Sequence, residues 1–276
     1  MLYTAPAGQD PWSLRYACSS DPEKLSMTLA DFSKAALFAC LFPGLLLLGA
    51  DDTAPPLRRL SIGIHVEYFP ARFVTTGSAV QISTNPVAQY NYTAASASPK
   101  WGPGAVVEYR LTKHVALAGE LHFHHVDYEQ TTELLSGTNT STTGGDNRPV
   151  TTIVATSQVN YYEIPLLAHY YGFWSHGWKR RIIFSGGLEL RHVGKIRTGN
   201  DFTYPSGATD YNENPAIPNR ANDLGAVVGV GLRFVDEFHI RISPEFRFIR
   251  WQAPSLQGPA YRSVVNQMEA GLSLSF

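Results

Sequence analysis

Apolar and polar residues alternate with a period of two along eight segments of the chain. In the first segment, LSIGIHVEY, every second residue from Leu60 onward is apolar and most of the residues between them are polar. This period is typical of a β-strand with one apolar and one polar face, because successive side chains point to opposite sides of the strand. We therefore predict eight strands, over residues 60–68, 104–111, 115–124, 161–171, 181–192, 224–234, 238–248 and 266–276.

The connections between these segments alternate between long and short. Thr112-Lys113, FWSHGWK and Asp236-Glu237 are short, whereas the other connections are long and most are rich in Thr, Ser, Asn or Gly. Strict alternation is expected when all long loops leave from one end of an up-and-down barrel.

The polar face of the predicted strands carries nearly all of their charge, and the apolar face carries almost none. A soluble barrel would pack the apolar face inward, where Gly119 and Gly186 would fill space poorly. Lipid around the barrel explains both features, since closed barrels satisfy their backbone within hydrocarbon. The fold class predicted is all-β, an eight-stranded antiparallel up-and-down transmembrane β-barrel with short periplasmic turns and long extracellular loops. The charged residues predicted to form a lumenal network are Glu67, Glu108, Arg110, Glu120, Glu163, Glu189, Arg191, Arg233, Arg241, Glu245, Arg247 and Glu269.

Aromatic residues gather near the predicted strand ends, where they would lie at the two membrane interfaces. The set near the short turns is Tyr109, Tyr170, Phe173, Trp174, Trp178, Phe234, Phe238 and Phe276, and the set near the long loops is Tyr68, Tyr128, Tyr162, Phe248 and Trp251.

The N-terminal part of the chain has a different composition from the rest. The apolar run at 35–50 is short and interrupted by Pro43-Gly44, so residues 27–50 are predicted to be a secretory signal peptide. Residues 1–26 fit no such pattern and are interpreted as an upstream extension from a mistaken start codon, with 57–276 as the barrel domain. Cys18 and Cys40 both precede the predicted cleavage, so no disulfide is expected; Cys40 as a lipoprotein anchor is the alternative.

The charge balance argues against nucleic acid as a partner. The chain has a formal net charge of -1, with 44% hydrophobic and 16% charged residues. A nucleic-acid-binding domain usually carries a basic surface. The partners predicted instead are outer-membrane lipid and an external ligand of unknown identity that the long loops bind.

Two kinds of motif resemble known outer-membrane barrels. AGLSLSF resembles the C-terminal signal that the barrel-assembly machinery reads, with Gly271, Leu272, Leu274 and Phe276 at the matching positions. The stretches YYEIPLLAHYY and RISPEFRFIRW resemble two strands of the PorT-like outer-membrane β-barrel family, small barrels of the OmpA/OmpX type. The resemblance implies a bacterial outer-membrane location and a barrel fold.

Pro165 and Pro244 fall inside predicted strands of a closed barrel. Proline lacks the N–H that a strand donates to its neighbour, so each position is expected to carry a bulge or a local distortion.

The histidines of HFHH are the strongest candidate for a chemical site. His122 and His124 share the predicted inward face beside Glu120, and two imidazoles at this spacing can bind one metal ion. The sequence identifies no third ligand, and hydrogen bonds to Glu67 or Glu163 are the commoner interpretation. No cofactor is predicted.

An outer-membrane lipid hydrolase is the enzyme alternative. His125 and His192 fall on the outward face near the long loops, where such a site would lie, but no serine pattern accompanies them. The function predicted is therefore that of an integral outer-membrane barrel without enzyme activity, with a lumen plugged by side chains and a structural or loop-mediated binding role. A passive pore for small solutes is the second interpretation.

Overall fold

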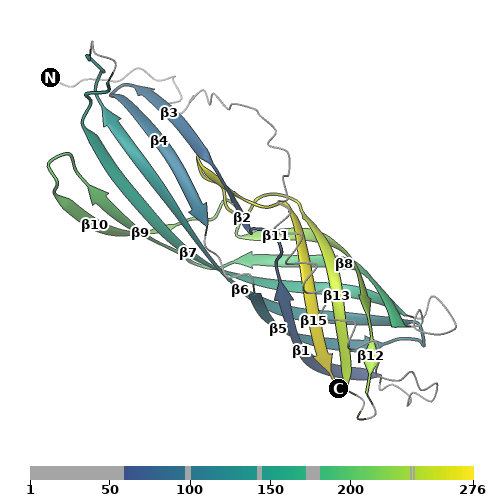
Figure 1. Ribbon diagram of the computed structural model, residues 1–276. Coiled ribbons are helices and arrows are strands. Elements are labelled where there is room, and N and C mark those ends of the chain that lie inside the picture. Colours follow the sequence, from purple (N-terminus) through teal and green to yellow (C-terminus); the bar gives the residue numbers. More distant parts are fainter. Residues whose placement is uncertain (1–58, 97–100, 142–144, 172–180, 237, 239) are drawn as a thin grey trace, which may run out of the picture.

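The computed structural model describes residues 59–96, 101–141, 145–171, 181–236, 238 and 240–276. Eight strands close into a ring in which every neighbouring pair is antiparallel (Figure 1). The predicted eight-stranded barrel is therefore confirmed. Its strands, in ring order, are β1 (Leu60–Tyr68), β5 (Trp101–Arg110), β6 (Val115–Ser136), β7 (Val150–Tyr171), β8 (Ile182–Val193), β11 (Asn222–Leu232), β13 (Arg241–Trp251) and β15 (Asn266–Ser275).

The predicted signal peptide at 27–50 and the extension at 1–26 lie outside the described residues. Within the described part of the chain, no helix is long and apolar enough to cross a membrane.

The ring closes where the last strand pairs with the first. The β1–β15 ladder runs from Gly63 opposite Ser275 to Tyr68 opposite Ala270. Beyond it, Phe276 and Ile62 exchange two backbone hydrogen bonds of 3.1 and 3.2 Å. Because both terminal strands find partners, neither presents a free edge along this seam.

The barrel buries charged side chains and exposes apolar ones, which is the reverse of the arrangement in a soluble protein. Of the twelve predicted lumenal charges, eleven are buried and Arg110 is half-buried. Each barrel strand in turn exposes a large apolar side chain, with exposed fractions of 39% to 60% in the set Ile64, Val107, Leu121, Leu166, Leu188, Val228, Phe246 and Leu274.

Some of the predicted interfacial aromatics do lie at the barrel ends. Tyr109, Tyr170, Phe238 and Phe276 are exposed near the short turns, and Tyr162 is exposed near the other end. Tyr68 and Phe248 are half-buried, while Phe173, Trp174 and Trp178 lie outside the described residues.

Three interfacial assignments are wrong. Tyr128 and Trp251 are buried because they fall on the inward parity of β6 and β13. Phe234 is buried beneath Arg181, whose guanidinium carbon lies 5.4 Å from the ring centroid.

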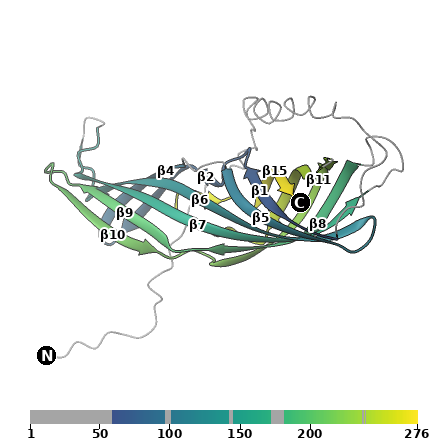
Figure 2. The same cartoon turned by 90° about the horizontal axis from the view of Figure 1, so that it is seen from below.

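The barrel sheet continues beyond one end of the barrel, and we call this extension the outer sheet. The far halves of β6 and β7 leave the ring and carry β4 (Val87–Ser96) with β3 (Ser78–Thr84) on one side (Figures 1 and 2). On the other side lie β9 (Ile196–Thr203) and β10 (Thr209–Ala216). The connections predicted as long loops are long, but three of them contain strands of this outer sheet.

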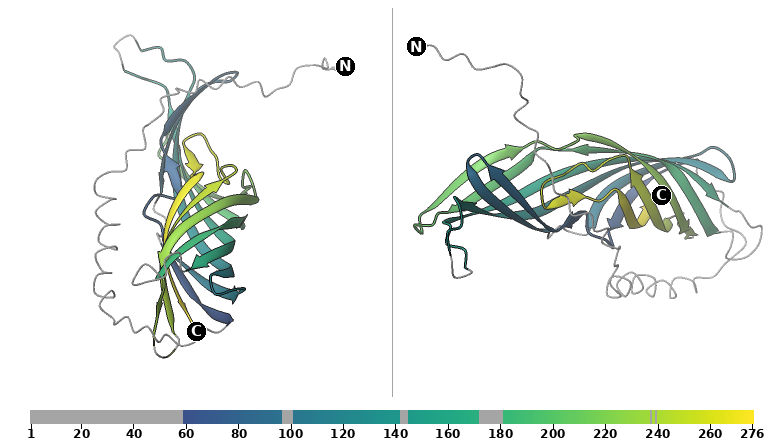
Figure 3. Two further views of the ribbon diagram at one scale, coloured as in Figure 1. Left: turned by 90° about the vertical axis from the view of Figure 1, so that its right-hand side faces the viewer. Right: turned by 90° about the horizontal axis from the view of Figure 1, so that it is seen from above.

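An apolar cap covers the lumen where β6 and β7 leave the ring. Its strands are β2 (Val74–Thr76) and β14 (Tyr261–Ser263), which pair with each other. The short strand β12 (Phe234–Val235) pairs with β13 at the opposite end. Figure 3 gives two further views of the barrel and of the strands that extend beyond one end of it. The buried cluster of the cap consists of Phe73, Val74, Val126, Tyr128, Val159, Tyr161, Val193, Ile196 and Leu256.

Both prolines interrupt a ladder without shifting its register. Between β6 and β7 the pairing lapses opposite Pro165, and the same register resumes on either side. Between β11 and β13 it lapses opposite Pro244 and resumes in register through β12. The expected local distortion is present, whereas a bulge would have inserted a residue and changed the register.

Candidate functional site

The central cluster of the lumen joins side chains from β1, β6 and β13. His122 Nδ1 contacts Glu67, and His122 Nε2 lies 2.9 Å from Glu120 Oε2. Arg247 donates to both carboxylate oxygens of Glu120, at 2.6 and 2.7 Å, and to Glu245 at 3.0 Å. The cluster is thus a chain of carboxylates joined by one histidine and one arginine, and buried charges need such partners for stability.

His124 continues this cluster toward the apolar cap. Its Nε2 lies 3.2 Å from Glu67 Oε2 and 2.8 Å from Glu163 Oε2. Glu67 and Glu163 are the two carboxylates named as its partners from the sequence. The ring of Phe69, at the edge of the cap, packs edge-on against His124 with centroids 4.7 Å apart.

Arg191 connects the charged cluster to the cap. Its Nε donates to Glu163 at 2.5 Å and its Nη2 to Gln267 at 2.6 Å. The guanidinium carbon lies 3.5 Å from the Trp251 ring centroid and 4.7 Å from that of Phe73. Aromatic faces attract a cation most strongly where water is excluded, so the cap and the cluster stabilise each other.

A second cluster lies nearer the short turns and is centred on Glu108. Arg233 Nη2 donates to its two oxygens at 2.7 and 2.8 Å, and Arg241 Nη1 donates at 3.3 Å. The Tyr171 hydroxyl also donates to Glu108, and His169 Nδ1 lies 3.1 Å away. One carboxylate thus has two guanidiniums as partners.

Three of the predicted network residues, Arg110, Glu189 and Glu269, belong to neither of these two clusters. Arg110 lies with its guanidinium carbon 5.8 Å from the Tyr171 ring centroid. Oxygens of Glu189, Glu269 and Glu163 fall within 4.8 Å of one another, and Gln267 donates to Glu269 at 2.8 Å. Overall the twelve charges comprise seven carboxylates and five guanidiniums, an excess of two negative charges.

The residues resembling an assembly signal divide between the two faces of β15. Gly271 faces the lumen beneath His65. Leu272, Leu274 and Phe276 alternate with it on the outward face, where Phe276 is 63% exposed.

His125 and His192 lie on β6 and β8, with β7 between them. His125 Nδ1 is 2.7 Å from Asn160 Oδ1, and its Nε2 is 3.1 Å from Asp127. His192 Nδ1 is 2.7 Å from Asn222 Oδ1. Among the described residues, neither ring is hydrogen-bonded to a serine hydroxyl.

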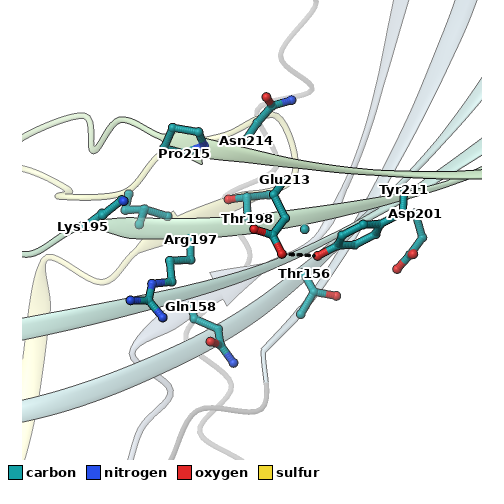
Figure 4. A pocket seen from close by; sticks show the side chains of 12 residues that line it. Thr156, Gln158, Lys195, Arg197, Thr198, Asp201, Tyr211, Glu213, Asn214 and Pro215 are labelled. Carbon is teal, nitrogen blue, oxygen red and sulfur yellow. Dashed lines mark hydrogen bonds between the residues drawn. The ribbon is translucent and has the colours of Figure 1, made fainter.

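The outer sheet contains a pocket of about 670 Å³ between β7, β9 and β10 (Figure 4). Lys195 and Arg197 lie at one end, and both are exposed and unpaired with any carboxylate of the described residues. Asp201, Tyr211 and Glu213 lie at the other end. The Tyr211 hydroxyl donates to Glu213 at 3.0 Å, and this hydrogen bond raises the pKa of Tyr211.

Sequence reasoning missed three glycines that shape the central cluster. A Cβ on Gly102 would collide with the His124 ring, and one on Gly104 with the His122 ring. A Cβ on Gly271 would come within 2.6 Å of the His65 ring. Glycine inside a strand often marks a close approach of another group, so these inward glycines were the available signal.

Comparisons with known proteins give a structural likeness only. No family model matches the chain, and no curated protein matches it, so the PorT-like resemblance stays a prediction. Two solved structures of Ail, the attachment invasion locus protein of Yersinia pestis, resemble it, one of them in complex with the heparin analogue sucrose octasulfate. Identities are 10% and 11%, TM-scores are 0.32 and 0.31, and each alignment covers 79% of this chain and 96% of Ail. At such TM-scores, the architecture of this chain rests on its own strand register.

Proposed function

We propose that the chain is an integral outer-membrane β-barrel protein of a two-membrane bacterium, exported by the signal peptide at 27–50 and similar to the PorT-like family. The observation that carries the proposal is the inversion of the barrel, with apolar side chains exposed on all eight strands and charges buried inside. Exposing such an apolar surface to water is energetically unfavourable, whereas the hydrocarbon of a lipid bilayer solvates it well.

Cell fractionation with gel mobility tests this location. The protein is expected in the outer-membrane fraction, and an unheated detergent sample is expected to migrate differently from a boiled one because the closed barrel resists detergent. Recovery in the soluble periplasmic fraction would reject the proposal.

We infer further that the lumen is closed to solutes by its own side chains. Both charged clusters are buried, and the apolar cap covers one end of them. An eight-stranded barrel has an interior just wide enough for side chains to fill. Refolded protein in a planar bilayer is expected to give no reproducible current steps, and such steps in the intact chain would favour the passive-pore alternative.

Deletion of Phe276 is expected to reduce the yield of outer-membrane protein and to leave chain in the periplasm. Under this proposal the residue belongs to a signal read by the barrel-assembly machinery, and it also forms two backbone hydrogen bonds with Ile62. Phe246→Ala, which removes an exposed aromatic from β13, is the matched control. Equal yields of the deletion and the intact chain in membrane fractions would contradict the signal.

We propose that the outer-sheet pocket binds an external ligand with an anionic group. Lys195 and Arg197 would supply the countercharge, and the pocket has the volume of a small-molecule site. Phosphorylated sugars are expected to bind more tightly than the matching neutral sugars in calorimetry. Lys195→Gln with Arg197→Gln should weaken that binding at least tenfold, since even a single charged hydrogen bond contributes roughly 1.5–3 kcal/mol. Arg59→Gln with Lys113→Gln, at the opposite end of the barrel, is the control; equal losses in both pairs would reject the pocket.

A further inference from the structure

Two strands that are not neighbours each present one histidine and one glutamate to the lumen. His65 and Glu67 lie two positions apart on β1, and Glu120 and His122 lie two positions apart on β6. β5 runs between these strands, and its Gly104 is the register partner of both histidines. With no side chain at Gly104, the two imidazole rings stack across β5 with centroids 4.8 Å apart.

We propose that this cluster is a binding site for one divalent transition-metal ion such as Zn²⁺, held by His65 Nε2, His122 Nδ1 and the Glu67 carboxylate. Two imidazoles and a carboxylate form a ligand set that zinc commonly takes in proteins, with water as a further ligand. From the sequence, His122 and His124 were the candidate ligands, and no third ligand could be identified. The missing ligands come from β1, which the barrel register places one strand away from β6, with only β5 between them.

The donor atoms converge without satisfying one another as hydrogen-bonding groups. His65 Nε2, both nitrogens of His122 and both oxygens of Glu67 are buried and lack a hydrogen bond of normal geometry. They nevertheless lie close together, with His65 Nε2 at 3.6 Å from Glu67 Oε1 and His122 Nδ1 in contact with the same oxygen. An ion between the three atoms would replace this direct contact and satisfy all three. Buried polar atoms without partners are costly, so the arrangement favours an occupant.

Other side chains fix the orientation of both histidines. His65 Nδ1 lies 2.7 Å from Ser273 Oγ, which leaves Nε2 facing the cluster. His122 Nε2 faces Glu120, and Arg247 holds that carboxylate through two hydrogen bonds. A hydrogen bond to the distal nitrogen, such as that between His65 and Ser273, selects the tautomer of a ligating histidine and orients its ring.

The charge of the lumen is consistent with one divalent cation. By formal count, with every carboxylate ionised, the two excess negative charges of the lumenal network equal the charge of one Zn²⁺. Protonation of two histidines would balance the charge equally well, so the experiment must distinguish a metal ion from protons.

The test uses full-length barrel refolded in detergent after treatment with a chelator. After dialysis against Zn²⁺ alone, elemental analysis is expected to find about one zinc per chain, and calorimetry in two buffers should show proton release as histidines bind the metal. Glu67→Gln and His65→Asn are each expected to weaken zinc binding at least tenfold. Ser273→Ala should weaken it about tenfold, because it removes only the orienting hydrogen bond.

His169→Asn is the matched control, since His169 is also buried in the lumen but belongs to the Glu108 cluster. Its zinc affinity is expected to equal that of the unaltered chain, and the gel mobility of unheated samples verifies that each variant is folded. Should Glu67→Gln or His65→Asn fail to fold, the unaltered barrel remains decisive, because it must bind zinc stoichiometrically. Sub-stoichiometric zinc, or equal binding by a folded Glu67→Gln variant, would overturn the proposal.

Discussion

Leu166→Arg is expected to lower the free energy of unfolding of the barrel in a phospholipid bilayer by about 2–4 kcal/mol, the cost of an arginine on the lipid face near the midplane. Leu166 lies in the middle of the barrel portion of β7 and is 54% exposed. Its register partners are Leu188 and Gly119, so the arginine would have no carboxylate beside it on the same face. Urea titration in large vesicles, followed by tryptophan fluorescence, measures the change.

Ile82→Arg is the control for this prediction. Ile82 is also an exposed aliphatic residue on a strand, but β3 belongs to the outer sheet. An exposed substitution of this kind in water usually changes stability by less than about 0.5 kcal/mol. A similar small change for Leu166→Arg would mean that the apolar belt does not face lipid.

The barrel strands could be predicted because each separates two environments. Every strand of the ring has one face toward the charged interior and one toward the apolar exterior, which imposes a period of two on its sequence. The outer sheet lacks this contrast. Thr151 and Thr152 of β7, for example, are followed along the strand by residues of intermediate burial on both parities. Its Thr, Val, Ile and Tyr residues favour strands, but composition alone does not separate a strand from a polar loop.

The membership of the lumenal network could be predicted, but its pairing could not. The alternation of polar and apolar residues along each strand was enough to place Glu67 and His122 on the inward face, where both are buried. That they meet depends on the stagger of three strands and on the absence of a side chain at Gly104. The apolar cap was missed for a related reason, since Phe73 and Leu256 lie in connections and become neighbours only when β2 pairs with β14.

Arg247→Met is expected to lower the free energy of unfolding by about 3–5 kcal/mol, because it leaves buried carboxylates without their countercharge. Arg247 is 1% exposed and donates hydrogen bonds to both Glu120 and Glu245. Arg250→Met is the matched control three positions along the same strand. Arg250 is exposed and donates a single hydrogen bond of 3.0 Å to Asn266, so its loss should cost about 1 kcal/mol or less.

A double-mutant cycle shows whether the loss comes from the ion pair itself. Adding Glu120→Gln to Arg247→Met removes one of the two uncompensated carboxylates and keeps its shape, so the double variant should recover part of the lost stability. Additive losses would instead mean that Arg247 acts through packing. The same proteins in planar bilayers extend the test to the closed lumen. Steps that appear with Arg247→Met and disappear in the double variant would show that charge compensation keeps water out of the lumen. Silence in all of them would assign that role to the apolar cap, where Phe73 and Trp251 enclose Arg191.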